Sequence, residues 1–180
     1  MSACLGTSLL LMVIRFSRGK KATIDHDDAL ATVEEELDKH LARLLPMAER
    51  DCASFDAVSN AYKLPKDTEE EQAVRARAIE EGMLGAMVVP EETLAAVRDV
   101  LQTMQAAMPY VGRNIASDLG SGAELLVAGG ESASYNVRIN AAYLKDRDKA
   151  TAALQQCDTV LQDLRDMHRE IRSKVDGMLT

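Results

Sequence analysis

Apolar residues recur at steps of three and four along most of this chain, and this spacing predicts amphipathic helices. The three clearest stripes are Leu30, Val33, Leu37, Leu41 and Leu44; then Leu94, Val97, Leu101, Met104 and Met108; and then Leu154, Cys157, Leu161, Leu164, His168, Ile171, Val175 and Met178. A histidine on such a stripe is more often a hydrogen-bonded packing residue than a metal ligand. Each stripe predicts one buried helix face.

A more continuous apolar run, Leu5–Phe16, predicts a core helix from about Ala3 to Ser17 that ends at Gly19. The run is too short to cross a bilayer. Its positive charges follow it instead of preceding it, which is the reverse of a signal peptide. We therefore expect a buried helix here and no membrane partner.

Proline and capping residues predict where the next helices begin and end. A helix that begins near Asp25–Asp28 is interrupted at Pro46, because proline has no backbone N–H to continue the helical hydrogen bonds. Thr68 and Glu71 have the spacing of a capping box, which predicts the start of another helix that runs to about Met87.

The second half of the chain is predicted to begin with a new helix at Pro90, since proline suits the first turn of a helix. The segment from Gly112 to Asn140 is rich in Gly, Ser, Ala and Asn. We interpret it as two short, closely packed helices joined near Gly129 and Gly130. A long amphipathic helix then completes the chain.

The composition supports an all-α bundle in a single domain, residues 1–180. Hydrophobic residues make up 47% of the chain, yet it has two Phe, four Tyr and no Trp, so the core consists of Leu, Ala, Val and Met. The net charge of −8 argues against nucleic-acid and anionic-membrane partners, which require a basic surface.

The cysteines and the motifs that are absent narrow the chemistry. Cys4, Cys52 and Cys157 are isolated and odd in number, which favours reduced thiols in a cytoplasmic protein over disulfides or a metal site. The chain has no P-loop, no Gly-x-Gly-x-x-Gly turn, no Gly-x-Ser-x-Gly elbow and no His-Glu-x-x-His motif. We therefore expect no metal and no nucleotide cofactor.

Asp51 is the most informative single residue, because it occupies a hydrophobic position. It belongs to the stripe Leu44, Ala48, Asp51, Phe55, Val58 and Tyr62, so its carboxylate is expected to point toward the core. A buried, unpaired charge is costly and is retained only with a partner or a purpose. The pattern alone favours a structural ion pair or a helix-end contact over a functional role.

Three other groups of polar residues are candidates for binding. Ser117 and Asp118 precede Leu119, where a helix N-cap is the simpler interpretation. Asn136 and Asn140 share one helical face, and amides near a core require hydrogen-bond partners on another helix or on a ligand. The lysines, which usually lie in solvent, are able to hold a polyanionic tail; they are Lys20, Lys21 and Lys66.

Several segments, taken in order, carry a family resemblance. They are Gly6, Leu10, Met12-Val13 and Gly19-Lys20-Lys21; Asp51 to Val58; Leu64-Pro65-Lys66 with Thr68-Glu69-Glu70; Val89-Pro90; Asn114 with Ser117 to Gly120; and Asn136 to Asn140. In this order they resemble formiminotetrahydrofolate cyclodeaminases and the related methenyltetrahydrofolate cyclohydrolases. The resemblance covers nearly the whole chain.

The resemblance implies a bundle of long antiparallel helices that is usually a homodimer and acts on one-carbon units carried by tetrahydrofolate. It places the catalytic acid on Asp51, which either assists the loss of ammonia or assists the attack of water on the methenyl bridge. It implies no cofactor beyond tetrahydrofolate as the substrate carrier. The implied substrate-binding residues are Asp118, Asn136 and Asn140 for the pterin, Lys20 or Lys66 for the folate glutamate, and Ser117 without a specified part of the substrate.

One departure from the family concerns the amino end. Relatives carry a Pro-Gly-Gly-Gly-Ser type of turn just ahead of the first helix, and this sequence begins at Met1 without it. The alternative is therefore a catalytically impaired helical dimer that serves as a structural or interaction protein.

Overall fold

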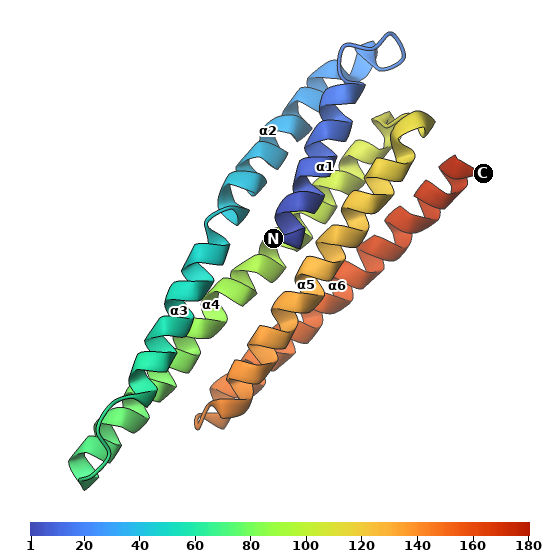
Figure 1. Cartoon of the computed structure of the whole chain (residues 1–180). Helices are drawn as coiled ribbons and strands as arrows, with labels where there is room; N and C mark the ends of the chain where they lie inside the picture. The colour runs from blue at the N-terminus through green and yellow to red at the C-terminus, as the bar shows by residue number, and fades with distance from the viewer.

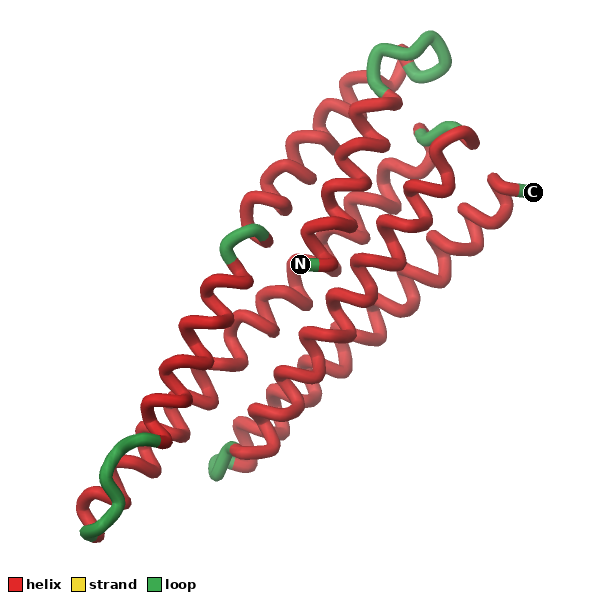
Figure 2. Tube along the Cα trace, viewed as in Figure 1, coloured by secondary structure: helices red, strands yellow, loops and turns green.

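The computed structural model describes all 180 residues as helices joined by short connections, without a β-strand (Figure 2). The α-helices are α1 (Ser2–Ser17), α2 (Asp27–Leu44), α3 (Met47–Tyr62), α4 (Glu69–Ala107), α5 (Ala116–Tyr143) and α6 (Arg147–Leu179). They lie along a common direction in an elongated bundle (Figure 1). Short 3-10 turns are η1 (Ile24–His26), η2 (Met108–Tyr110) and η3 (Arg113–Ile115). The predicted all-α fold is confirmed.

The core is one cluster of 39 buried hydrophobic residues. The predicted stripes supply it: Leu30, Val33, Leu37 and Leu44 from α2; Leu94, Val97, Leu101 and Met104 from α4, with Met108 just after it; and Cys157, Leu161, Leu164, Ile171 and Val175 from α6. The Leu, Ala and Met residues of this core are good helix formers. No helix has both the length and the apolar character required to cross a membrane.

Two predicted boundaries are correct and have clear local causes. α2 ends at Leu44 and α3 begins at Met47, on either side of Pro46. At the start of α4, the backbone N–H of Glu71 donates to the Thr68 hydroxyl at 3.2 Å, and the N–H of Thr68 donates to the Glu71 carboxylate at 3.1 Å. The two bonds form the predicted capping box, which satisfies donors that a helix end leaves free.

The predicted helix start at Pro90 is wrong, because α4 continues through that residue from Glu69 to Ala107. The predicted break near Gly129 and Gly130 is also wrong, because both glycines lie inside the continuous helix α5. The first break was inferred because proline favours the first turn of a helix, and the second because glycine disfavours a helix interior. In both places, contacts with other helices outweigh these preferences.

The glycines of α5 serve close helix packing. A Cβ atom on Gly6 of α1 would lie 2.8 Å from the carbonyl oxygen of Gly122, and one on Gly130 would lie 2.6 Å from Leu164 Cδ1. Real Cβ atoms do not approach other atoms so closely, so Gly6 is required against the backbone of Gly122, whereas a Cβ on Gly130 would force the end of the Leu164 side chain to move. The gain in packing offsets the roughly 1 kcal/mol by which glycine disfavours a helix interior.

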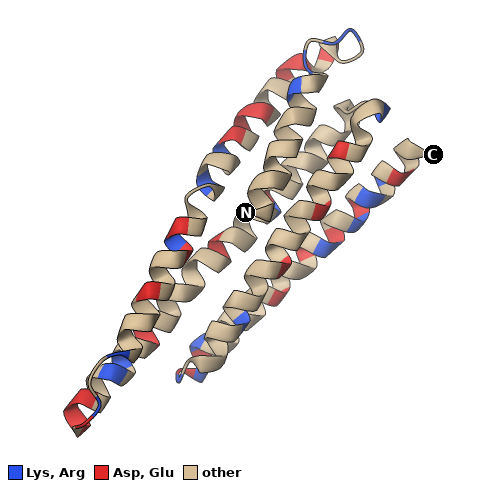
Figure 3. Cartoon of the chain, viewed as in Figure 1, with Lys and Arg blue, Asp and Glu red and all other residues tan.

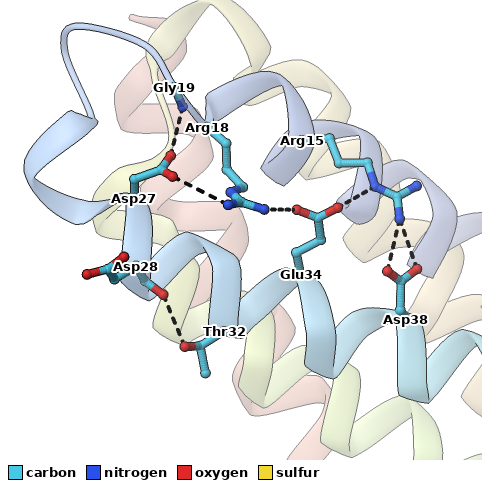
Figure 4. A network of polar contacts seen from close by, with 8 residues as sticks. All are labelled: Arg15, Arg18, Gly19, Asp27, Asp28, Thr32, Glu34 and Asp38. Atoms are coloured by element: carbon cyan, nitrogen blue, oxygen red, sulfur yellow. Dashed lines mark hydrogen bonds and ion pairs between the residues drawn. The ribbon is translucent and has the colours of Figure 1, made fainter.

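Charged residues tie the carboxyl end of α1 to α2 (Figure 4). Glu34 accepts hydrogen bonds from Arg15 Nε at 2.7 Å and from Arg18 Nη1 at 2.6 Å, and Arg15 Nη2 also reaches Asp38 at 2.9 Å. The two arginines lower the pKa of the Glu34 carboxyl group, Arg15 having the larger effect. Figure 3 shows that the rest of α1 carries no charge.

Gly19 makes the turn that follows α1. Its φ is +64°, a left-handed conformation that glycine adopts without strain. Its backbone N–H donates to Asp27 at 2.7 Å, and this bond is the main cause of the lowered pKa of Asp27. The turn therefore joins α1 to the start of α2.

Candidate functional site

Asp51 lies on α3 at the boundary between two cavities. The N-terminal cavity has a volume of about 390 Å³ and is formed by the first residues of α1, the α2–α3 junction, the middle of α4 and α5. The aromatic cavity has a volume of about 530 Å³ and is formed by α3, α4 and the end of α5. Asp51 and Asn136 line both cavities, so the two spaces meet at this pair.

The expectation that Asp51 points into the core is corrected by the structure. Asp51 is half-buried, and no side chain of the protein forms an ion pair or hydrogen bond with its carboxylate. Phe55 and Tyr62, from the same stripe, are 69% and 44% exposed. α3 packs mainly against α4, so its apolar stripe forms the wall of a groove. The structural ion pair that the pattern favours is absent.

Asn136 and Asn140 lie opposite Asp51 on the last turns of α5, as their spacing predicts. Both line the aromatic cavity. Asn140 Nδ2 donates to the carbonyl oxygen of Ala86 on α4 at 3.2 Å, whereas the Asn136 side chain has no partner in the chain. Asn136 therefore presents free donors and an acceptor to the groove, and Asn140 retains its carbonyl oxygen.

The bond from Asn140 explains how α4 passes through Pro90. The carbonyl of Ala86 would normally accept a hydrogen bond from the residue four positions later, and that residue is Pro90, which has no N–H. Asn140 supplies the missing donor from another helix. Sequence reasoning singled out Asn140 and Pro90 separately and missed that one compensates for the other.

Beyond the aromatic cavity lies a third space, the basic cavity, with a volume of about 490 Å³. Tyr62 and Tyr143 line both, so the two cavities adjoin. The basic cavity contains three cationic side chains, those of Lys66, Arg75 and Lys145. The only carboxylate in its lining, Glu80, accepts backbone hydrogen bonds from Lys145 and Asp146, the first of which is the main cause of its lowered pKa.

The three cavities therefore follow one another as a groove with an ordered chemistry. It runs from the mixed N-terminal cavity, past Asp51 and Asn136, through the aromatic cavity to the basic cavity. The excess of positive charge at one end stands out in a protein with a net charge of −8. No group of three or more His, Cys, Asp or Glu side chains lies close enough together to hold a metal ion.

Several predicted binding residues lie outside this groove. Ser117 and Asp118 are in the first turn of α5, nineteen and eighteen residues before Asn136, or roughly 28 Å along the helix. Neither is the N-cap, which is Ile115. Lys20 lies before α2, at the end remote from α3, with its ammonium 4.5 Å from the centre of the Phe16 ring. Of the predicted lysines, Lys66 alone lines the groove.

Other lining residues escaped the sequence analysis. Neither Arg75 nor Lys145 was singled out as a binding residue, and Lys145 lies so far along the chain from Lys66 that no local pattern connects the two. Thr93 lies one turn after Val89 and donates to its carbonyl oxygen at 2.8 Å; it lines the N-terminal cavity. The only sequence feature that pointed to this part of α4 was Pro90, a proline within a helical pattern.

Comparison with known proteins places these observations in a family. The sequence model of the family described as formiminotransferase-cyclodeaminase matches residues 1–159. A methenyltetrahydrofolate cyclohydrolase from Methylorubrum extorquens is 32% identical over 174 residues, which are 97% of this chain and 84% of the relative. A formimidoyltransferase-cyclodeaminase from Gallus gallus is 29% identical over 162 residues, which are 90% of this chain but 30% of that longer protein.

A solved structure agrees with the fold. The crystal structure of a formiminotetrahydrofolate cyclodeaminase from Thermotoga maritima matches with a TM-score of 0.86 over 99% of this chain and 85% of that one, at 21% identity. At that identity the likeness concerns the fold alone.

Proposed function

The chain belongs to the formiminotransferase-cyclodeaminase family, and we propose that it is an enzyme of folate one-carbon metabolism in which Asp51 acts as general acid and base. The observation that carries the proposal is the unpaired, half-buried Asp51 carboxylate at the junction of two cavities, opposite Asn136. A carboxylate in this position is available to take a proton from a bound substrate or water and to return it.

The cyclohydrolase reaction makes direct use of this arrangement. Asp51 accepts a proton from water as its oxygen adds to the cationic methenyl carbon, and the carboxylate stabilises that cation before the attack. The tetrahedral adduct then opens: the bond from the carbon to N5 breaks, Asp51 returns its proton to N5, the hydroxyl group on the carbon releases its remaining proton to solvent, and the formyl group remains on N10. The Asn136 amide opposite is suited to hold the water or the new oxygen by a hydrogen bond.

The cyclodeaminase reaction requires the same group. N10 of formiminotetrahydrofolate attacks the carbon of the protonated formimino group, and a proton passes from N10 through Asp51 to the departing nitrogen. The bond from the carbon to that nitrogen breaks, ammonia leaves, and the methenyl bridge forms. The same carboxylate serves both reactions, so turnover of the two substrates distinguishes them.

The order of the cavities matches the order of groups in a folate. The pterin fits the N-terminal cavity, where the hydroxyl oxygens of Thr93 and Ser132 are able to accept hydrogen bonds. The one-carbon centre then lies at Asp51, the aminobenzoyl group in the aromatic cavity, and the glutamate carboxylates in the basic cavity with Lys66. Cationic side chains at that end supply charge-assisted hydrogen bonds to carboxylates. Lys20, Ser117 and Asp118 have no part in this arrangement.

The test is turnover of the two substrates by the purified protein. Loss of the methenyl absorbance reports the cyclohydrolase reaction, and ammonia release from formiminotetrahydrofolate reports the cyclodeaminase reaction. Asp51→Asn should lower kcat by about 10²- to 10⁴-fold with unchanged helical content. Asp56→Asn is the control, because Asp56 is an exposed acid on α3 outside the cavities.

Two outcomes would contradict the proposal. One is turnover that survives in Asp51→Asn. The other is a folded wild-type protein that acts on neither substrate, which would support the alternative of an impaired member with a structural role.

A homodimer is part of the proposal, and the outer face of α1 supports it. Leu5, Met12 and Phe16 are large apolar residues that lie exposed along this helix at steps of seven and four. Such a stripe is typical of a surface covered by another chain. We expect a dimer in light scattering and a monomer for Met12→Lys; a monomeric wild type would refute this part.

A cytoplasmic location is also proposed, on the basis of the three cysteines. Cys4, Cys52 and Cys157 form no disulfide within the chain, and Cys157 is buried. Unpaired thiols are typical of a reducing compartment. Fractionation of cells that produce the protein at native levels tests this location.

A further inference from the structure

Two tyrosines stand where the aromatic cavity meets the basic cavity. Tyr62 is the last residue of α3 and Tyr143 is the last residue of α5. Both rings line both cavities. Their exposed fractions are 44% and 59%, so these two large rings are left partly uncovered where the two cavities adjoin. We refer to them as the tyrosine pair.

The position of Tyr62 is fixed from one side by Arg75. The guanidinium carbon of Arg75 lies 5.5 Å from the centre of the Tyr62 ring, a distance at which a cation is attracted to the ring face. Arg75 Nη2 also donates to the Tyr62 carbonyl oxygen at 3.2 Å. Because α3 ends at Tyr62, that carbonyl has no partner in its own helix. Arg75 therefore holds both the ring and the backbone of Tyr62.

The surroundings of the tyrosine pair define the chemistry of a matching ligand. On one side are the apolar side chains of Phe55, Val58 and Ile139, and on the other are the cations of the basic cavity. A flat aromatic group with a carboxylate-bearing tail suits this sequence of environments, because rings stack on rings and carboxylates pair with cations.

We propose that the tyrosine pair holds the aminobenzoyl-glutamate part of the substrate and thereby sets the distance between the one-carbon centre and Asp51. This inference rests on the proposed function. Tyr143 follows Asn136 by seven residues, or about 10 Å along α5, so the ring of the substrate lies between the reacting carbon and the tyrosine pair. Tyr62 and Tyr143 are binding residues, and Arg75 is a positioning residue that acts through Tyr62.

Kinetics of leucine and phenylalanine variants test the role of the rings. Tyr62→Leu and Tyr143→Leu should each raise KM about two- to tenfold, the range that corresponds to one aromatic pair, with kcat changed less than KM. Tyr62→Phe and Tyr143→Phe retain the ring and should stay close to the wild type. The control is Tyr135→Leu, because Tyr135 is a similarly exposed residue of α5 that lines neither cavity.

The Arg75 role is tested by a double-mutant cycle. Arg75→Lys retains the charge but loses the planar fork that holds the Tyr62 carbonyl. It should raise KM in the wild-type background and have little effect on KM in the Tyr62→Leu background. Equal effects in both backgrounds would show that Arg75 does not act through Tyr62.

A binding experiment separates this inference from the proposed function. The probe is p-aminobenzoylglutamate, which contains the ring and the carboxylates but no reacting carbon. Its saturation-transfer NMR signal should weaken in both leucine variants and persist in Tyr135→Leu. That result supports the tyrosine pair even if the wild-type protein turns over neither folate.

Two results would overturn the inference while leaving the enzyme assignment intact. The first is an active wild type whose KM and probe binding are unchanged in both leucine variants. The second is a change of oligomeric state in those variants without a change in KM, which would identify the tyrosine pair as part of a protein interface.

Discussion

The two ends of α5 differ in how closely neighbouring helices approach them. Along the first half of α5, helix α1 lies very close. A Cβ atom added to Gly122 would lie 3.3 Å from the carbonyl oxygen of Gly6, and one added to Gly129 would lie 3.1 Å from the Cβ of Ala3. Over its last turns, Asn136 and Tyr143 face an open groove instead. We call these the closed half and the open half.

The difference follows from side-chain size. Glycine and alanine allow two helix backbones to meet, which excludes water and any ligand. Asparagine and tyrosine in the open half place hydrogen-bonding and aromatic groups in the aromatic cavity. One helix thus serves as packing surface along one stretch and as the wall of the proposed substrate site along the next.

The closed half should tolerate almost no added volume. In Gly6→Ala the new methyl group would meet the Gly122 carbonyl oxygen and Leu126 at 2.8 Å, so the helices must separate. We expect a loss of about 1–3 kcal/mol in the free energy of unfolding, measured by urea denaturation. The matched control is Gly85→Ala, because a Cβ there has no neighbour within 4 Å. That control should gain stability by up to about 1 kcal/mol. Equal effects of the two substitutions would refute the close-packing account.

In the open half, the largest effect on stability is expected from the bond between Asn140 and Ala86. Asn140→Ala leaves the Ala86 carbonyl without a donor and should cost about 1 kcal/mol, at the low end of the usual range because the site is only partly buried. Pro90→Ala restores a backbone N–H that can bond the same carbonyl. Asn140→Ala should therefore cost much less in the Pro90→Ala background. An equal cost in both backgrounds, measured by denaturation, would contradict the compensation.

The same residues show what can be predicted from the sequence. Period-3.6 stripes predict the helices and their buried faces, because burial of apolar surface depends on local spacing. Asp51 stood out for the same reason, as a charge on an apolar stripe, and Asn136 and Asn140 as amides on one face. These three residues do meet across the groove.

What the sequence could not predict depends on contacts between distant segments. Continuity through Pro90 requires a donor from α5, about fifty residues away in the chain. The basic cavity joins Lys66, a predicted binding residue, to Arg75 and Lys145, which look like ordinary surface residues by themselves. Local preferences for breaks and caps are weak, at about 1 kcal/mol each, so tertiary contacts readily override them.

The basic end of the open half should distinguish substrates by their tails. Lys145→Gln removes one of three cations from the basic cavity and should raise KM about two- to threefold for a substrate with several glutamates, and less for one with a single glutamate. Added salt should reduce the difference, because screening weakens exposed charge pairs. The control is Lys174→Gln on α6, outside the groove. If both lysine variants behave alike with both substrates, the basic cavity does not bind the tail.

The smallest effect is expected at Glu34, which holds α1, the helix packed on the closed half of α5, to α2. Its pKa is lowered in the folded protein by Arg15 and then Arg18, so the ionised carboxylate stabilises the fold above the pKa of the unfolded chain, about 4.3. Glu34→Gln should therefore lower the thermal midpoint slightly at pH 7. The difference in thermal midpoint between Glu34→Gln and the wild type should narrow as the pH falls below about 4, because the wild-type carboxylate then becomes protonated and loses its ion pairs as well.

The control is Glu36→Gln, because Glu36 is an exposed residue of the same helix without an ion pair. This variant should show no pH-dependent difference in thermal midpoint from the wild type. A gap between Glu34→Gln and the wild type that stays constant from pH 7 to pH 3 would show that packing of the side chain, and not its charge, holds α1 to α2.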